Sequence, residues 1–194
     1  TLSLILRHKA LELWINIDRA GFCKTEDVLA ANCMRAFGCT MENIDNAVET
    51  NDKQRFEIQM MNDVHHIRAV QGHSIHAVED DASLTKLTQD SPDLPERCVH
   101  GTYRRHLPSI MQGGLKPGGA NGARFRKHIH FTPFQPGDQE VISGFRYNAE
   151  VAIWVDMKKA MAAGIPFYIS PNKVILSPGT VSYTHLTLPT KWTV

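Results

Sequence analysis

The sequence lacks the features that mark several large classes of protein. Its four cysteines form no CxxC pair and no dense framework, so we expect reduced thiols and an intracellular protein, either cytoplasmic or nuclear. No apolar run is long enough to span a bilayer and no signal-peptide pattern is found, so we expect no membrane partner. The sequence contains no GxGxxG motif, so it gives no indication of a Rossmann sheet. The formal net charge is only +1, so any anion-binding site has to be local.

The segment 67–74, with the sequence IRAVQGHS, concentrates groups that bind anions. Arg68 presents a planar fork of donors that fits phosphate oxygens, and Gly72 allows a backbone N–H to approach an anion. His73 and Ser74 add further donors. We interpret the segment as a strand end and loop that binds phosphate. The alternative is a polar turn with a solvated arginine, and the segment alone favours neither.

The first part of the chain predicts helices. Apolar residues recur with helical spacing over residues 2–14, where Arg7 and His8 can share one edge of the helix. A surface charge beside a core histidine is the alternative for this pair. Thr25 and Thr40 are each expected to cap the start of a further short helix.

A β-hairpin is expected after these helices. Residues at 55–59 and 65–70 alternate as strands do, and a polar gap separates them. Three helices followed by a hairpin is the order of a winged-helix domain, which often binds nucleic acid. Polar, acidic and proline-bearing residues at 80–95 then indicate a boundary between two domains.

Two pairs of histidines have the residue type that binds metal ions. His65 and His66 are adjacent on a predicted strand, so their side chains point to opposite faces. His128 and His130 share a face, but no third ligand lies at a familiar spacing. We therefore expect no metal site.

The second half of the chain predicts more strands than helices. Strands are expected at 98–102, 128–131, 150–155, 167–169 and 174–176, and helices at 107–115 and 158–163. Strands with short connections indicate a mixed α+β domain. Residues 181–194 continue no pattern, and we exclude them from the functional interpretation as a divergent, artefactual tail.

Taken together, these motifs resemble the RNA 2′-phosphotransferase family, the tRNA 2′-phosphotransferases that act with NAD. The resemblance covers residues 2–179 and depends on the order of short motifs that are individually weak. They are Leu6-Arg7-His8, Lys53-Gln54-Arg55-Phe56, the segment 67–74, His100-Gly101-Thr102, Gly114-Leu115, His128-Ile129-His130, Ser143-Gly144-Phe145-Arg146 and Val174-Ile175-Leu176.

The resemblance implies an α+β protein of two lobes. Residues 1–85 would form a winged-helix lobe that binds RNA, residues 95–180 an ADP-ribosyltransferase-fold lobe that binds NAD, and the site would lie in the cleft between them. The internal 2′-phosphate of an RNA such as spliced tRNA would displace nicotinamide from NAD, giving a 2′-phospho-ADP-ribosyl RNA. The ribose hydroxyl would then attack phosphorus and release 2′-OH RNA and ADP-ribose 1″,2″-cyclic phosphate. NAD would be consumed as a co-substrate without a metal, and we expect a monomer.

The resemblance also implies roles for single residues. The catalytic set would be Arg7, His8, Arg68 and Arg146. The substrate phosphate would also contact Gln71, His73 and Ser74. NAD would be bound by His100, Gly101, Thr102, Ser109, Gly114, Leu115, His130, Ser143 and Gly144.

Many proteins with this second fold carry a catalytic glutamate, but the matching segment here, 174–176, is apolar. That absence agrees with a phosphate nucleophile, which is already an anion. Two alternatives stay open: a transferase that caps phosphorylated RNA or DNA ends and stops after the first step, and a non-enzymatic winged-helix binder of nucleic acid. The binder leaves His100-Gly101-Thr102 and Arg146 unexplained.

Overall fold

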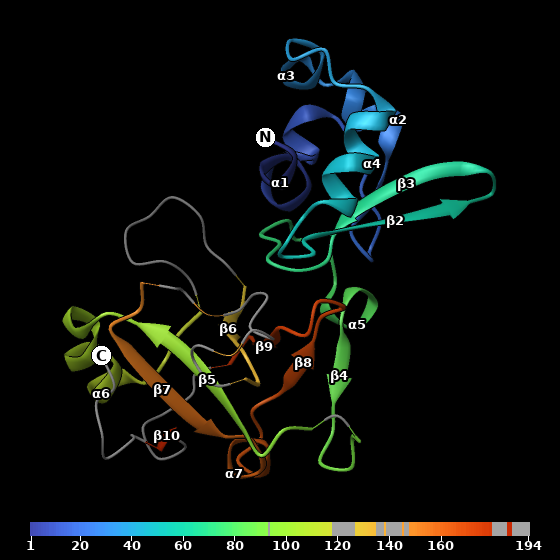
Figure 1. The fold of residues 1–194 in the computed structure, drawn as a ribbon. Coiled ribbons are helices and arrows are strands. Elements are labelled where there is room, and N and C mark those ends of the chain that lie inside the picture. The colour runs from blue at the N-terminus through green and yellow to red at the C-terminus, as the bar shows by residue number, and fades with distance from the viewer. Residues whose placement is uncertain are drawn as a thin grey trace. The chain divides into compact units, whose positions relative to one another are not determined.

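The computed structural model describes residues 1–92, 94–117, 127–134, 138, 145 and 148–179, and the backbone of 186–187. The chain divides into two compact units, which we call unit 1 (Thr1–Leu84) and unit 2 (Thr85–Val194). Each unit combines short helices with small antiparallel sheets (Figure 1). The structure is therefore of the mixed α+β class, as the sequence indicates.

Unit 1 begins with one helical segment whose pitch changes along its length. Helix α1 (Leu2–Leu4) runs into a π-helical turn, η1 (Ile5–Lys9), and then into a tight 3-10 turn, η2 (Leu11–Leu13). The apolar spacing predicts a helix over 2–14 but does not reveal these changes in pitch. The segment ends at Trp14, whose φ is +59°.

Three further helices follow in unit 1: α2 (Thr25–Ala30), α3 (Asn32–Arg35) and α4 (Met41–Glu49). The cap expected at Thr40 is confirmed, because its hydroxyl accepts from the Asn43 N–H and the Asn43 side chain accepts from the Thr40 N–H. The cap expected at Thr25 is wrong. Thr25 is the first residue of α2, and its hydroxyl instead contacts Nδ1 of His65 at 2.7 Å.

The sheet of unit 1 has the strand order β1-β3-β2 and is antiparallel. Strands β2 (Phe56–Met61) and β3 (Val64–Ala69) form the expected hairpin, and they turn at Asn62 and Asp63, which both have positive φ. Strand β1 (Phe22–Lys24), which the sequence does not predict, pairs with β3. Helix α5 (Asp80–Ser83) ends the unit.

Unit 2 contains two small sheets among the residues that the structure describes. Their strand orders are β10-β7-β5 and β4-β8-β9-β6, and every pairing is antiparallel. The strands are β4 (Thr85–Leu87), β5 (Arg97–Thr102), β6 (Ile129–Phe131), β7 (Val151–Asp156), β8 (Phe167–Ile169), β9 (Ile175–Ser177) and β10 (Leu186–Thr187). The helices are η3 (Arg104–His106), α6 (Leu107–Gly113) and α7 (Met157–Ala162).

Two segments that the sequence leaves without structure carry regular elements. The acidic stretch 80–95 includes both α5 and β4, and β4 pairs with β8. Within the tail, β10 pairs with β7. The elements α5, β4 and β10 are very short, so their residues are too few to show a periodic pattern in the sequence.

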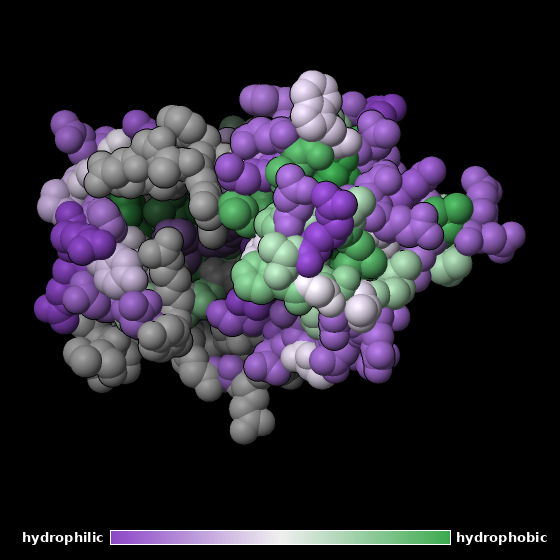
Figure 2. Space-filling view, turned by 90° about the horizontal axis from the view of Figure 1, so that it is seen from above, coloured by the Kyte–Doolittle hydropathy of each residue, from purple (hydrophilic) through white to green (hydrophobic). Residues whose placement is uncertain are grey.

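Each unit has its own apolar core. The core of unit 1 includes Ile5, Val28 and Ile67, and the core of unit 2 includes Phe131 and Ile153. Hydrophilic residues cover most of the coloured surface in Figure 2, interrupted by hydrophobic patches. No helix in the described part of the chain is long and apolar enough to cross a membrane.

Candidate active site

Arg7 lies in the π-helical turn η1 and packs against the backbone of Gly72. A Cβ built on Gly72 would lie 3.6 Å from Nε and 3.7 Å from Cζ of Arg7. Gly72 has a φ of +85°, which glycine adopts without strain. Because Nε and Nη2 of Arg7 are buried, the guanidinium is held against the loop that follows β3.

His8 is tied to the same loop. Its Nδ1 atom lies 2.9 Å from the hydroxyl oxygen of Ser74. The backbone N–H of Ser74 donates to the carbonyl oxygen of Arg7 at 2.9 Å. A side-chain contact and a main-chain contact therefore fix this loop to the helix that carries Arg7 and His8.

The two remaining polar residues of the loop, Gln71 and His73, are buried. A Cβ built on Gly21 would lie only 3.0 Å from Nε2 of His73, and Gly21 has a φ of +87°. Any larger residue at position 21 would press on the imidazole and strain the backbone. Gly21 and His73 lie far apart in the sequence, so only the structure shows their contact.

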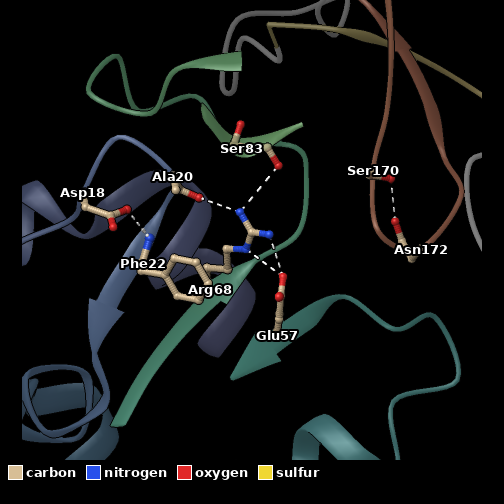
Figure 3. A network of polar contacts seen from close by, with 8 residues as sticks. All are labelled: Asp18, Ala20, Phe22, Glu57, Arg68, Ser83, Ser170 and Asn172. Carbon is tan, nitrogen blue, oxygen red and sulfur yellow. Dashed lines mark hydrogen bonds and ion pairs between the residues drawn. The ribbon is translucent and has the colours of Figure 1, made fainter. Parts of the chain in front are cut away.

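Arg68 lies on β3, and its guanidinium is held from several sides (Figure 3). Nε and Nη2 donate to one carboxylate oxygen of Glu57 at 2.8 and 2.6 Å. Nη1 donates to the carbonyl of Ala20 at 3.1 Å and to that of Ser83 at 3.5 Å. The guanidinium carbon lies 4.6 Å from the centroid of the Phe22 ring. The sequence predicts Arg68 as a donor to phosphate but misses Glu57, its partner.

Unit 1 thus assembles a guanidinium, an imidazole and a hydroxyl from the η1 turn and the loop after β3. Arg68, on the strand that precedes this loop, carries a second guanidinium, and its contacts are with Glu57, Ala20, Ser83 and Phe22. These are the groups that bind phosphate oxygens in proteins. The assignment to phosphate from segment 67–74 remains a prediction, and the structure supplies a local framework for it.

The buried thiols are not suited to act as nucleophiles. Burial, together with the charges of Asp18 and Asp27, raises the pKa of Cys23 to about 12. Burial alone raises the pKa of the Cys98 thiol well above its usual value. Both thiols are therefore protonated near neutral pH, and a protonated thiol is a weak nucleophile.

In unit 2, the candidate residues of the motif His100-Gly101-Thr102 end strand β5. Nδ1 of His100 lies 2.8 Å from the carbonyl oxygen of His130 on β6. Because a carbonyl can only accept, Nδ1 carries the hydrogen, and in neutral His100 Nε2 is then an acceptor. The ring of His100 also meets that of Phe131 edge-on, with the centroids 5.9 Å apart.

Gly101 has a steric reason to be glycine. A Cβ at this position would lie 2.8 Å from Cε2 of Phe145 and 2.9 Å from Cβ of Ala149. Thr102 is buried, and its carbonyl accepts from the N–H of Glu150 at 2.9 Å. The end of β5 is therefore packed closely against Phe145, Ala149 and Glu150, which lie more than forty residues later in the sequence.

The other candidate residues for NAD lie in different settings. Ser109 is exposed on α6, and its hydroxyl donates to the carbonyl of His106 at 2.8 Å. Gly114 ends α6 with a φ of +73°, and Leu115 belongs to the core of unit 2. Ser143, Gly144 and Arg146 lie outside the described residues.

The histidines considered as metal ligands each contact different protein groups. His65 contacts Thr25 and, through Nε2, Asp45 at 3.3 Å, while Nδ1 of His66 donates to the carbonyl of Val64. His128 is buried, with its ring 6.4 Å from that of Tyr168. Across the part of the chain that the structure describes, no three His, Cys, Asp or Glu residues are placed to hold a metal ion.

The fold and these contacts define an α+β protein with polar and cationic side chains gathered at the η1 turn and the loop after β3. Comparison with known proteins gives the family. The family model described as RNA 2′-phosphotransferase, Tpt1/KptA family, matches residues 1–179. This chain belongs to that family.

Curated relatives match over most of the chain. The tRNA 2′-phosphotransferase 1 of Danio rerio is 39% identical over 181 residues, which are 92% of this chain and 76% of the relative. The protein of the same name from Homo sapiens is 40% identical, over 92% of this chain and 67% of the relative. The tRNA 2′-phosphotransferase of Saccharomyces cerevisiae is 33% identical, over 91% and 75%.

Proposed function

We propose that this chain removes an internal 2′-phosphate from RNA, such as spliced tRNA, by transferring it to NAD. The observation that carries this proposal is the assembly in unit 1, where the loop after β3 holds Arg7 and His8 beside its own polar groups. The family to which the chain belongs and the names of its relatives supply the reaction class and the RNA.

We assign unit 1 as a winged-helix lobe and unit 2 as an ADP-ribosyltransferase-like lobe. Short helices followed by the β2–β3 hairpin, which β1 extends to a three-stranded antiparallel sheet, support the first assignment. Two small antiparallel sheets with the His100-Gly101-Thr102 motif at the end of β5 support the second. In this assignment unit 1 supplies the phosphate-binding groups and unit 2 supplies the groups that bind NAD.

The polar groups of unit 1 have complementary uses on a phosphate monoester. Arg7 supplies positive charge that does not depend on pH in the neutral range, and Arg68 supplies a guanidinium donor whose charge is partly offset by Glu57. Ser74 fixes the imidazole of His8, because either group can donate to the other. Gly72 leaves the backbone open at the position where Arg7 packs. Together these residues would bind and orient the 2′-phosphate.

The residues of unit 2 fit a ribose-bearing co-substrate such as NAD. With Nδ1 of His100 donating to the His130 carbonyl, Nε2 is an acceptor that suits a ribose hydroxyl or an amide N–H. The ring of Phe131, which is buried in the core of unit 2, supports the imidazole edge-on. Bound NAD would supply an electrophilic ribose carbon and nicotinamide as the leaving group.

The first step of this reaction does not need a strong general base. A phosphate monoester is already an anion near neutral pH, so attack on the ribose carbon depends on alignment and charge stabilisation. A phosphate oxygen bonds to that carbon, and nicotinamide leaves with the bonding electron pair. The ribose 2″-hydroxyl then bonds to phosphorus, the bond to the RNA 2′ oxygen breaks, and the proton passes to that oxygen. Arg7 and Arg68 would stabilise the phosphoryl charge throughout.

The proposal is tested by mixing the protein with NAD and a short RNA that carries one internal 2′-phosphate, without added metal. Mass analysis then resolves the products. We expect dephosphorylated RNA, nicotinamide and ADP-ribose cyclic phosphate. The same RNA with a 2′-hydroxyl is the control, and it should be unchanged.

The other outcomes separate the alternatives. An RNA that gains ADP-ribose and stops would replace the proposal with a capping transferase. An RNA that binds but does not react, with no saturable thermal shift from NAD, would replace it with a non-enzymatic binder.

A further inference from the structure

Glu57 and Arg68 form a cross-strand ion pair that no motif of the sequence singles out. They are directly opposite residues on β2 and β3. Both arginine donors reach the same carboxylate oxygen, Oε2, at 2.8 and 2.6 Å. The Arg68 side chain is only 12% exposed and that of Glu57 is 39% exposed, so the guanidinium is shielded from solvent while the carboxylate is partly open to it.

The contacts of Arg68 account for most of its hydrogen-bonding capacity. A guanidinium has five N–H groups. Glu57 takes two of them, and the carbonyls of Ala20 and Ser83 face Nη1, so one N–H on Nη2 has no acceptor among the described residues and can meet a ligand. The Phe22 ring covers the guanidinium at 4.6 Å, which also restrains its position. Arg68 therefore offers phosphate a fixed direction and a charge, and it does not offer its whole fork.

We propose that Glu57 is a positioning residue for Arg68: it sets the direction of the Nη2 N–H that contacts the RNA 2′-phosphate. This inference rests on the proposed function. The carboxylate acts through the geometry of its oxygen, because a single atom receives both hydrogen bonds. Without that oxygen, the guanidinium would keep its charge but lose the restraint on its rotation.

The geometry separates two substitutions sharply. In Glu57→Gln an amide oxygen can occupy the place of Oε2 and accept both hydrogen bonds, so only the negative charge is lost. In Glu57→Ala the oxygen itself is lost. We expect Glu57→Ala to lower kcat/KM for 2′-phosphorylated RNA by about 10- to 100-fold, since small displacements of a positioning contact have effects of this order. We expect Glu57→Gln to stay within about fivefold of wild type.

The matched control is Glu79→Gln, because Glu79 also pairs with an arginine of unit 1, Arg19, but that pair is exposed. This variant should have wild-type turnover and wild-type RNA binding. In all variants the KM for NAD should be unchanged, because the substitutions lie in unit 1. Circular dichroism melting curves identify any variant that fails to fold, and in that case Glu57→Gln and Glu57→Asp carry the test.

The decisive readout is the preference for phosphorylated over unphosphorylated RNA, measured as a ratio of Kd values. Glu57→Ala should lower the ratio of the Kd for unphosphorylated RNA to the Kd for phosphorylated RNA in the wild-type background. It should leave this ratio unchanged in the Arg68→Ala background. Equal losses in both backgrounds, or equal losses in Glu57→Ala and Glu57→Gln, would overturn the positioning role.

Failure of the inference can be told from failure of the proposed function. A wild-type protein with no preference for phosphorylated RNA would overturn both. A wild-type protein that prefers it and turns it over, together with a Glu57→Ala variant that does so equally well, would overturn the inference alone.

Discussion

The two units hold their candidate residues in different ways. In unit 1 polar side chains hold one another: His8 contacts Ser74, and Arg68 is bound by Glu57. In unit 2 the motif at the end of β5 is fixed by the backbone and by packing, since His100 contacts a carbonyl and Gly101 lies against Phe145.

This difference teaches what each unit is able to recognise. A network of charged and polar side chains responds to the charge of a ligand and loses function when one partner is removed. A packed strand end responds to the shape of a ligand and loses function when volume is added. The proposed function asks unit 1 to bind a phosphate and unit 2 to bind a nucleoside, and the contrast predicts that the two units fail in these different ways.

The strongest way to break this comparison is Arg68→Ala, with Arg35→Ala as the control. We expect kcat/KM for phosphorylated RNA to fall by about 10²- to 10³-fold in Arg68→Ala, as when a donor to a developing charge is removed. Arg35 is exposed on α3, and its side chain donates to Asn32 of the same helix, so its substitution should leave turnover unchanged. Steady-state assays check this, and equal activity would remove Arg68 from the site.

Gly101→Ala tests the packed strand end in unit 2. The added Cβ would approach Phe145 and Ala149 within 3 Å, so we expect a loss of about 1–3 kcal/mol in the free energy of unfolding, together with weaker NAD binding. RNA binding by unit 1 should be retained. Urea unfolding and an NAD thermal shift measure both effects.

Gly113→Ala is the matched control for that substitution, because a Cβ there meets only the flexible end of Lys116, at 3.3 Å. It should be neutral in both measurements. A stable Gly101→Ala protein with full NAD affinity would show that shape at the end of β5 does not matter, which contradicts the contrast between the units.

Much of unit 1 could be predicted from the sequence because its signals are local. The Asn62-Asp63 turn and the alternation around it predict the hairpin, and Thr40 with Asn43 predicts a cap. The same turn also contains the signal for Glu57, which is as far before Asn62 as Arg68 is after Asp63. Counting outward from the turn would have paired the two residues.

The features that could not be predicted depend on contacts between distant segments. Strand β1 is too short to show alternation and forms only because β3 is available to pair with it. Thr25 looks like a cap, but its hydroxyl contacts His65. The close approach of Gly21 to His73 is likewise tertiary. Arg146, which the resemblance adds to the catalytic set, lies outside the described residues and stays a prediction.

Buried thiols allow the two units to be monitored separately. Cys23 lies in unit 1 and Cys98 in unit 2, and the raised pKa of each keeps it unreactive until its unit opens. With iodoacetamide at pH 8, half-buried Cys33 and Cys39 should be labelled first. NAD at about ten times its Kd should slow labelling of Cys98 by about tenfold, and phosphorylated RNA should slow that of Cys23 similarly.

Peptide mass analysis follows each thiol over time. Unphosphorylated RNA is the control ligand and should protect Cys23 less. Equal protection of both thiols by NAD alone would show that the units open together, and the separation of roles would then lose its thermodynamic basis.

The smallest effect that we expect sharpens the comparison within unit 1. Trp14 ends the helical segment that carries Arg7 and His8, its side chain is 95% exposed, and its φ is +59°. A left-handed conformation costs a residue with a Cβ about 1–2 kcal/mol, and glycine returns part of this through its greater freedom in the unfolded chain. Trp14→Gly should therefore raise the free energy of unfolding by about 0.5–1 kcal/mol.

Trp14→Ala is the control, because alanine keeps the Cβ and the strain. Urea unfolding followed by circular dichroism should rank Trp14→Gly above both wild type and Trp14→Ala. The gain should appear as slower labelling of Cys23 with no change at Cys98, because Trp14 and Cys23 lie in unit 1 and Cys98 lies in unit 2. A Trp14→Gly protein less stable than Trp14→Ala would mean that the left-handed residue does not strain unit 1. Stabilisation at both thiols would show instead that the two units share one unfolding transition.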